Sequence, residues 1–520
     1  MLSVILLGVL TIIYLLYKYF SNSGYREKLS KFKKEPALPF IGHSHRLGKT
    51  KEDLLPMIEK MWIKFGRDKF LLKLGNVDHI VITNPKDVEA LLITHRLLDK
   101  NVLYKHVADL VGDGILTVEP SKWHTLRKVL TPAFYTEVLE SHETIYQEQS
   151  EVLIKKLEET DNAELNFLDV FFQIVLVSVT KGVIGLDLNL EVDRQYLDFL
   201  TELVAITNDK VFSPWKHINF LYNITPEGRT FKKKLQWVYE KNLKVLAEKR
   251  EKLKYIIDDI NSGKNTFESI TEEANFVKKK LGFLDLLLLA KTTNGEPLSN
   301  EAITAEILTF TLAGIETSSA TAAFAIYNLA TNPEIQERAL EEQRQITNND
   351  LSQPVTVKQV KEMSYLNAIV KETMRLDNPV VFYGREVMQD VALPDGTILP
   401  AGVNVLFFPY FSHKNPDIFP NPNEFDPERF INNNPAPFTY YPFSVGVRDC
   451  IGKRSAMIQI KFFLASLIRK YEFLPPTGPA PKVTVELWIL IIRSFGQILK
   501  LVYFVVLYYL PTLDGNMYNG

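Results

Sequence analysis

The chain has 520 residues, of which 46% are apolar, and its formal charge is −2 because 60 Lys and Arg face 62 Asp and Glu. This composition suffices for a large buried core and excludes an acidic disordered protein and a globally basic nucleic-acid binder. The single cysteine, Cys450, excludes an intramolecular disulfide and a zinc site of paired cysteines. We therefore expect a body that folds in a reducing compartment and binds no nucleic acid.

The N-terminus predicts a membrane anchor. Residues 1–17 carry no charge, and five basic residues between positions 26 and 34 would keep the body in the cytosol. A cleaved signal peptide is the alternative, but no basic residue precedes the apolar run and no small-residue cleavage pattern follows it. The chain divides into an anchor at 1–20, a basic and proline-rich linker at 21–39, a body at 40–500 and an atypical tail at 501–520.

Local patterns predict a mostly α-helical body with a small β part. Strand patterns occur at Phe70–Leu74 and His79–Thr83 across a Gly75-Asn76 turn, and Asn84-Pro85 opens a helix. Residues 167–179 are apolar but short for a membrane span, so we expect a buried core helix. Further helical patterns follow at 299–328, 333–346 and 365–376.

Two of these helices carry polar groups that a structural helix does not need. Residues 313–317 place Gly314, Glu316 and Thr317 inside a long helix, although a solvent-facing acid beside a helix-bending threonine would explain them equally well. Glu372 and Arg375 stand three residues apart on one helical face, close enough to pair. Arg429, in the later sequence PNEFDPERF, could close a network with that pair.

The segment from Phe443 to Gly452 surrounds the only cysteine with glycines and an arginine. As a phosphate loop it fails, because the glycine spacing is one residue too long and no hydroxyl follows Lys453. A nucleophilic cysteine would need a histidine base, and the nine histidines show no such signature. An inert buried cysteine needs no flanking glycines, whereas a thiolate metal ligand does use amides brought close by them.

Together these motifs resemble the microsomal cytochromes P450, which are haem-thiolate monooxygenases, from Pro36 to about Leu499. The segment around Trp123 resembles the animal fatty-acid hydroxylase clan within that family. The matches are Phe443, Gly446, Arg448, Cys450 and Gly452 to FxxGxRxCxG, Glu372 and Arg375 to ExxR, Pro427–Phe430 to PERF, Trp123 and Arg127 to WxxxR, and Ala313–Thr317 to AGx[DE]T.

The resemblance implies the P450 fold, with 40–500 as one large haem-thiolate catalytic domain. It implies haem b whose iron takes the Cys450 thiolate as axial ligand, with Ala313 and Phe443 beside the haem. Glu316 and Thr317 match the acid–alcohol pair that delivers protons near the oxygen site. The propionate-binding positions are Trp123, Arg127, Arg385 and Arg448, and Glu372, Arg375 and Arg429 form a charged network behind the haem.

The resemblance also implies partners and a location. No GxGxxG follows a strand, so electrons from NADPH would arrive through NADPH-cytochrome P450 reductase, with cytochrome b5 as a further partner. The residues expected to steer the reductase are Lys122, Lys128, Lys453, Arg454 and Lys461. The body would lie on the cytosolic face of the endoplasmic reticulum membrane, touching lipid at 212–222, and insert one oxygen atom of O2 into a hydrophobic lipid, hormone or xenobiotic.

Two other function classes stay open. A haem-thiolate isomerase or dehydratase would use the same cysteine without external electrons, and it should lack the Glu316–Thr317 pair. A catalytically impaired haem-binding membrane protein would keep Cys450 without consuming NADPH.

Four departures from the family pattern bear on this choice. Ala313 replaces a glutamate that often esterifies the haem in this clan, which predicts noncovalent haem. Asp377 and Asn378 precede Pro379 where aromatic residues and proline are usual. Asp449 adds a carboxylate beside the thiolate, and ten apolar residues at 501–510 extend the usual C-terminus.

Overall fold

The computed structural model describes residues 23–39, 41–46, 53–95, 97–159, 166–185, 194–272, 281–292, 295–431, 435–475, 482–486, 489–494 and 501–503. The anchor expected at 1–20 and residues 504–520 of the tail lie outside the described residues. Within the linker, α2 covers Ser23–Ser30.

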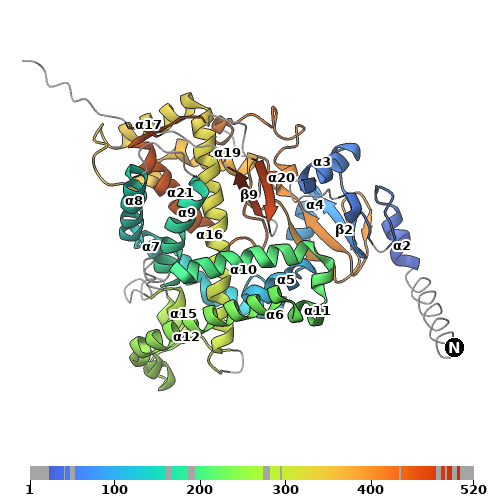
Figure 1. Ribbon diagram of the computed structural model, residues 1–520, viewed down its shortest axis with the longest axis horizontal. Helices are drawn as coiled ribbons and strands as arrows, with labels where there is room; N and C mark the ends of the chain where they lie inside the picture. Colours follow the sequence, from blue (N-terminus) through green and yellow to red (C-terminus); the bar gives the residue numbers. More distant parts are fainter. Residues whose placement is uncertain are drawn as a thin grey trace, which may run out of the picture.

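One long helix, α16 (Asn300–Thr331), runs through the middle of the molecule (Figure 1). Ser299 caps its start, because the side chain accepts a hydrogen bond from the Ala302 backbone N–H. Its sides pack against α9 (Phe167–Val177), α19 (Ser364–Leu376) and α21 (Lys453–Ile468). A helix covered on several sides is buried nearly all round, which explains why its apolar residues do not form a single stripe.

Shorter helices surround this centre. They are α3 (Leu54–Lys64), α4 (Pro85–Glu89), α5 (Leu103–Val111), α6 (Pro120–Leu130), α7 (Thr136–Glu140), α8 (Glu143–Glu158), α10 (Arg194–Phe212), α11 (Asn219–Ile224), α12 (Pro226–Asn261), α13 (Phe267–Thr271), α15 (Phe283–Leu289), α17 (Pro333–Ile346), α18 (Val357–Glu362) and α20 (Pro409–Ser412). Short 3-10 helices occur at η1 (Ser44–Arg46), η4 (Thr131–Phe134), η6 (Pro214–His217) and η7 (Pro427–Phe430), and π-helical segments occur at η3 (Ala90–Thr94) and η5 (Ser178–Ile184).

A four-stranded sheet lies to one side of the helices, in the order β1-β2-β6-β3 (Figure 1). Strands β1 (Phe70–Leu74) and β2 (Val77–Ile82) pair antiparallel, β2 pairs parallel with β6 (Asn404–Phe407), and β6 pairs antiparallel with β3 (Tyr383–Glu386). Small pairs join β4 (Val391–Ala392) to β5 (Ile398–Leu399) and β8 (Lys482–Glu486) to β9 (Ile489–Ser494).

The boundary expected between the body and the tail, at residues 500 and 501, lies directly before a strand that pairs with the body. Residues Leu501–Tyr503 form β10, which pairs antiparallel with β7 (Tyr471–Phe473). The first residues assigned to the tail therefore join the edge of the body.

The elements expected from local patterns are confirmed. The two predicted strands are β1 and β2, and the side chain of Asn84 caps α4 by accepting from the Lys86 N–H. Helices α16, α17 and α19 coincide with the predicted helical segments to within three residues. The expected fold class, mostly α with a small β part, is correct.

Helix α9 is a core helix, as its composition and length predict. Among the described residues, one helical stretch, Phe167–Ile184, is long and apolar enough to cross a membrane. Most of it is buried inside the protein, with Phe171 and Leu176 fully enclosed. It packs on α16 and α8, so its apolar character is used within the core.

Replacing Phe171 tests this assignment. F171A removes a fully buried ring from α9, and we expect the free energy of unfolding to fall by about 3–5 kcal/mol. Phe220, which is 76% exposed on α11, is the control, and F220A should leave stability within about 0.5 kcal/mol of the parent. Denaturant unfolding followed by circular dichroism measures both, and equal effects would contradict the assignment.

Candidate functional site

A cavity of about 340 Å³ lies between α16 and the loop that carries Cys450. Helix α5, the loop that follows it and the segment before β3 complete its walls. Most of its lining is apolar and includes Val107, Leu110, Ile115, Phe134, Phe310 and Val380. The cavity therefore suits an apolar guest held out of water.

The Cys450 loop is shaped by backbone constraints. The Cys450 N–H donates to the Phe443 carbonyl at 2.9 Å, and both residues line the cavity. Gly446 has a φ of +83°, and a Cβ there would lie 2.5 Å from the Leu92 carbonyl oxygen, so only glycine fits. The loop ends at Gly452, the N-cap residue of α21.

Cys450 lines the cavity, and its side chain is accessible there. Burial raises its pKa, the Gly452 amide lowers it, and the neighbouring Asp449 carboxylate raises it again. A metal cation bound to the sulfur would reverse this balance, because a coordinated thiol is deprotonated.

Three cationic side chains in the cavity wall lie close to one another, and we call Lys100, Arg385 and Arg448 the cationic cluster. Burial and the other two cations hold the pKa of Lys100 well below its usual value, while burial and Arg385 lower that of Arg448 to about 10. Within the described part of the chain none of the three forms an ion pair. Arg448 Nε and Nη1 are buried without hydrogen-bond partners.

Backbone carbonyl groups orient the guanidinium groups of Arg385 and Arg448. Arg385 donates to the Leu97 and Gly384 carbonyls at 3.2 and 2.9 Å, and Arg448 Nη2 donates to the Val118 carbonyl at 2.8 Å. The Arg448 guanidinium lies 5.0 Å from the centre of the Trp123 ring. Trp123 is thus a buried support for Arg448 and is not among the residues that line the cavity.

Arg127 lines the cavity but already has an anionic partner. It donates to the Asp449 carbonyl at 2.7 Å and to Asp449 Oδ1 at 2.8 Å, and Lys453 Nζ donates to Asp449 Oδ2 at 2.8 Å. The carboxylate next to Cys450 therefore joins α6 to the start of α21. The sequence flagged Asp449 as a departure but gave no sign of this bridge.

The polar residues in the middle of α16 face the cavity. Ala313, Gly314, Glu316 and Thr317 all line it. Thr317 Oγ1 donates to the Ala313 carbonyl at 2.8 Å, a bond that bends or loosens a helix locally. A Cβ on Gly314 would lie 3.2 Å from Val179, so close packing of α16 against η5 favours glycine there.

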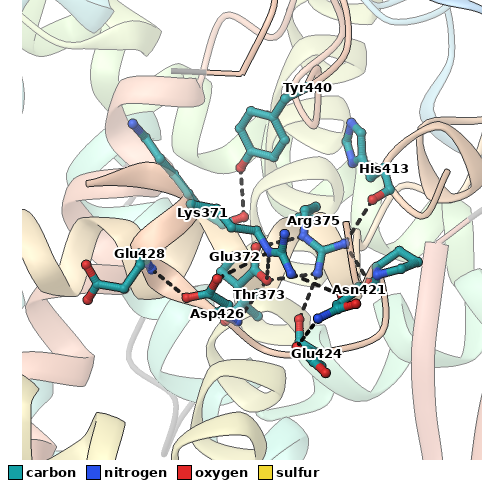
Figure 2. Close-up of polar contacts among 12 residues, drawn as sticks. Lys371, Glu372, Thr373, Arg375, His413, Asn421, Glu424, Asp426, Glu428 and Tyr440 are labelled. Atoms are coloured by element: carbon teal, nitrogen blue, oxygen red, sulfur yellow. Dashed lines mark hydrogen bonds and ion pairs between the residues drawn. The ribbon is translucent and has the colours of Figure 1, made fainter. Parts of the chain in front are cut away.

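The charged network lies away from the cavity, where α19 meets the segment 413–429 (Figure 2). Glu372 and Arg375 are fully buried, and Arg375 donates from Nε and Nη2 to the two carboxylate oxygens at 2.7 and 2.8 Å. Arg375 also donates to the carbonyls of residues 413, 422 and 424. Arg429 Nε lies 3.4 Å from Glu372 Oε1, so the structure brings all three network residues together.

Local hydrogen bonds explain why Asp377 and Asn378 precede Pro379 in this chain. Asn378 is fully buried, and its Oδ1 accepts from the Val380 N–H at 3.1 Å, which makes a tight turn. Asp377 accepts from Asn328 on α16 at 3.3 Å. The turn delivers Pro379 and Val380 to the cavity wall.

Sequence reasoning missed Lys100 and misplaced Lys461. Lys100 stands in a segment without a recognisable motif, and only the fold brings it beside Arg385 and Arg448. Lys461 was expected on the surface, but it is buried on α21 and its Nζ donates to the Val360 carbonyl at 2.9 Å. The apolar residues on both sides of Lys461 were the available signal for its burial.

Comparison with known proteins identifies the family. The cytochrome P450 family model matches residues 33–499. The chain belongs to the cytochrome P450 family. It is 31% identical to cytochrome P450 4d1 of Drosophila melanogaster, covering 87% of this chain and 90% of that protein. It is also 32% identical to cytochrome P450 4c21 of Blattella germanica, covering 88% and 90%.

A solved structure gives the same result for the fold. The crystal structure of the cytochrome P450DA haem domain superposes with a TM-score of 0.75 at 22% identity, covering 91% of this chain and 97% of that one. The resemblance stated from the sequence motifs is therefore confirmed. The protein is a P450 monooxygenase, and membership implies a haem iron held by a cysteine thiolate.

The site fits such a cofactor. Haem is a flat apolar ring with two carboxylates, and the cavity offers apolar walls, one thiol and a cationic cluster that forms no ion pair with any described residue. Carboxylates at the cationic cluster would satisfy the buried N–H groups of Arg448.

Breaking the buried ion pair tests the network. R375L leaves the Glu372 carboxylate buried without its partner, and we expect stability to fall by about 3–5 kcal/mol. The exposed pair between Arg338 and Glu428, 2.6 Å apart, is the control, and R338Q should cost less than about 1 kcal/mol. Thermal unfolding measures both, and a small effect of R375L would refute the role of the network.

Proposed function

We propose that this monooxygenase inserts one oxygen atom of O2 into a hydrophobic small molecule bound in the cavity, with Cys450 as the axial ligand. The observation that carries the proposal is the placement of the only cysteine in the wall of a mostly apolar cavity that Glu316 and Thr317 also line. The haem, when bound, supplies the activation of oxygen. Lipids, hormones and xenobiotics are the substrate classes that this lining suits.

The cationic cluster would bind the haem carboxylates. Arg385 and Arg448 are held by backbone carbonyls, so their guanidinium groups are oriented before a ligand arrives. Trp123 would act through Arg448, while Arg127 would position the Cys450 loop through Asp449. Ala313 and Phe443 would contact the ring from the walls, and alanine at position 313 supports noncovalent haem.

Thr317 and Glu316 would deliver protons on the α16 side of the cavity. The Thr317 O–H donates to the Ala313 carbonyl, so its oxygen keeps acceptor capacity for a proton donor. Glu316, one residue earlier and also in the cavity wall, is the acid that could recharge it.

Electrons would come from NADPH through NADPH-cytochrome P450 reductase, with cytochrome b5 as a second donor. A surface hollow behind Phe443 supports this, because apolar residues such as Leu139 and Met457 line it and Lys361, Lys453 and Arg454 contribute cationic groups. Lys122 and Lys128 are exposed on α6 nearby. An acidic flavoprotein surface would be attracted to this combination.

We assign the protein to the endoplasmic reticulum membrane, with the catalytic domain in the cytosol. Exposed apolar side chains on and around α11 support a lipid contact: Ile218, Phe220, Leu221 and Ile224. They would lie against the bilayer in which residues 1–20 form the anchor, while 40–500 form the catalytic domain. One relative, cytochrome P450 4e5 of Drosophila mettleri, is named mitochondrial, so fractionation of tagged protein tests this assignment.

Reconstitution with reductase, NADPH and isotopically labelled O2 tests the proposed reaction. We expect products from a panel of hydrophobic compounds to carry one labelled oxygen atom. NADPH-independent conversion would instead indicate a haem-thiolate isomerase or dehydratase.

Removing the Thr317 hydroxyl should uncouple the reaction. T317A loses the acceptor for the incoming proton, so NADPH consumption continues while product per NADPH falls by about tenfold or more. T317S, which keeps the hydroxyl, is the matched control and should stay within about threefold of the parent. Unchanged coupling in T317A would exclude Thr317 from proton delivery.

A further inference from the structure

A carboxylate stands directly before Cys450 in the chain. Asp449 and Cys450 both line the cavity, and the peptide group that joins them is fixed at both ends. Arg127 Nη1 donates to the Asp449 carbonyl at 2.7 Å. The Cys450 N–H donates to the Phe443 carbonyl at 2.9 Å. Because consecutive Cα atoms lie ~3.8 Å apart, the charge of Asp449 stands close to the sulfur.

Two cations hold this carboxylate, one from each flanking helix. Arg127 of α6 donates to Asp449 Oδ1 at 2.8 Å. Lys453, the first residue of α21, donates to Asp449 Oδ2 at 2.8 Å. We call Arg127, Asp449 and Lys453 the carboxylate bridge. Its formal charge is +1, because two cations face one anion.

The carboxylate bridge extends from the cavity to the outer surface. Arg127 and Asp449 line the cavity, and their side chains are 24% and 21% exposed. Lys453 is 50% exposed and lines the surface hollow behind Phe443. Charges that are partly removed from water are screened less than charges on an open surface. The two inner members therefore act on the Cys450 side of the cavity largely through protein.

We propose that the Asp449 carboxylate sets the reduction potential of a haem iron ligated by Cys450, because it offsets the two cations of the carboxylate bridge. This inference rests on the proposed function, which takes Cys450 as the axial ligand. Adding one electron at the iron makes that site more negative, so a nearby anion opposes the reduction and a nearby cation favours it. Asp449 thus lowers the potential, while Arg127 and Lys453 raise it.

A purely structural role for the carboxylate bridge leads to a different expectation. If the bridge only held the Cys450 loop in place, removal of either Asp449 or Lys453 would break the same hydrogen bond and shift the potential in the same direction. An electrostatic role gives shifts of opposite sign for the anion and the cation. The sign of the shift therefore distinguishes the two roles.

Anaerobic spectroelectrochemical titration of the full-length holoenzyme, without substrate or reductase, measures the potential. D449N removes the negative charge and keeps the shape of the side chain, so we expect the potential to rise by about 59 mV, a tenfold change in the one-electron equilibrium. K453Q removes a positive charge, so the potential should fall, and by less because Lys453 is half exposed. The double variant D449N/K453Q keeps the formal charge of the parent and should return to within about twofold of its equilibrium.

Two control variants accompany these changes. D449E keeps the negative charge and should leave the equilibrium within about twofold of the parent. E337Q removes a carboxylate from the exposed pair of Glu337 and Arg344, 2.7 Å apart on α17, and should not move the potential. The described residues of α17 are not among those that line the cavity. Each variant is first checked for the red-shifted band of its carbon monoxide complex, so that only thiolate-ligated proteins are compared.

The outcomes separate this inference from the proposed function. An unchanged potential in D449N, or shifts of the same sign in D449N and K453Q, would overturn the role of Asp449 while Cys450 ligation stands. If D449N takes up no haem, K453Q decides, because a lower potential supports the electrostatic role and an unchanged one refutes it. If the wild type itself lacks the red-shifted band, the proposed function fails, and this inference fails with it.

Discussion

The buried ion pair between Glu372 and Arg375 is the constraint on which the rest of the structure depends. Two charges removed from water are stable only when their remaining hydrogen-bonding groups are also satisfied. Arg375 meets this condition by directing its donors to the Glu372 carboxylate and to the carbonyls of residues 413, 422 and 424. The pair thereby fixes the chain that leads toward Cys450 against α19, which itself packs on α16 and α21.

The cavity that this framework creates is electrostatically one-sided. Lys100, Arg385 and Arg448 lie close to one another in its wall, while Val107, Leu110 and Ile115 belong to its apolar walls. Such a distribution suits a ligand with anionic groups on one edge and an apolar body, which describes haem. Asp449 adds a carboxylate to this wall, where it accepts hydrogen bonds from Arg127 and Lys453.

Much of the fold and part of the site were predictable because their signals are local. The helical spacing places Glu372 and Arg375 on one face, Asn84-Pro85 marks a helix start, and the positive φ of Gly446 is a requirement of its own loop. Contacts between segments far apart in the sequence leave no such local signal. Lys100 joins the cationic cluster, and Asp449 meets Arg127, only because segments hundreds of residues apart pack together, and no pattern near either residue records that contact.

The same distinction explains the wrong and incomplete expectations. Lys461 was expected on the surface because it is charged, although its apolar neighbours on α21 determine its burial. The Trp123 ring lies beside Arg448, and its expected contact with the haem carboxylates stays a prediction.

The most direct test of the central claim is the carbon monoxide difference spectrum of the reduced, purified protein. Thiolate ligation by Cys450 predicts a strongly red-shifted Soret band in the wild type and loss of that band in C450S. A wild-type band at the unshifted position, or a protein that folds without taking up haem, would contradict the account.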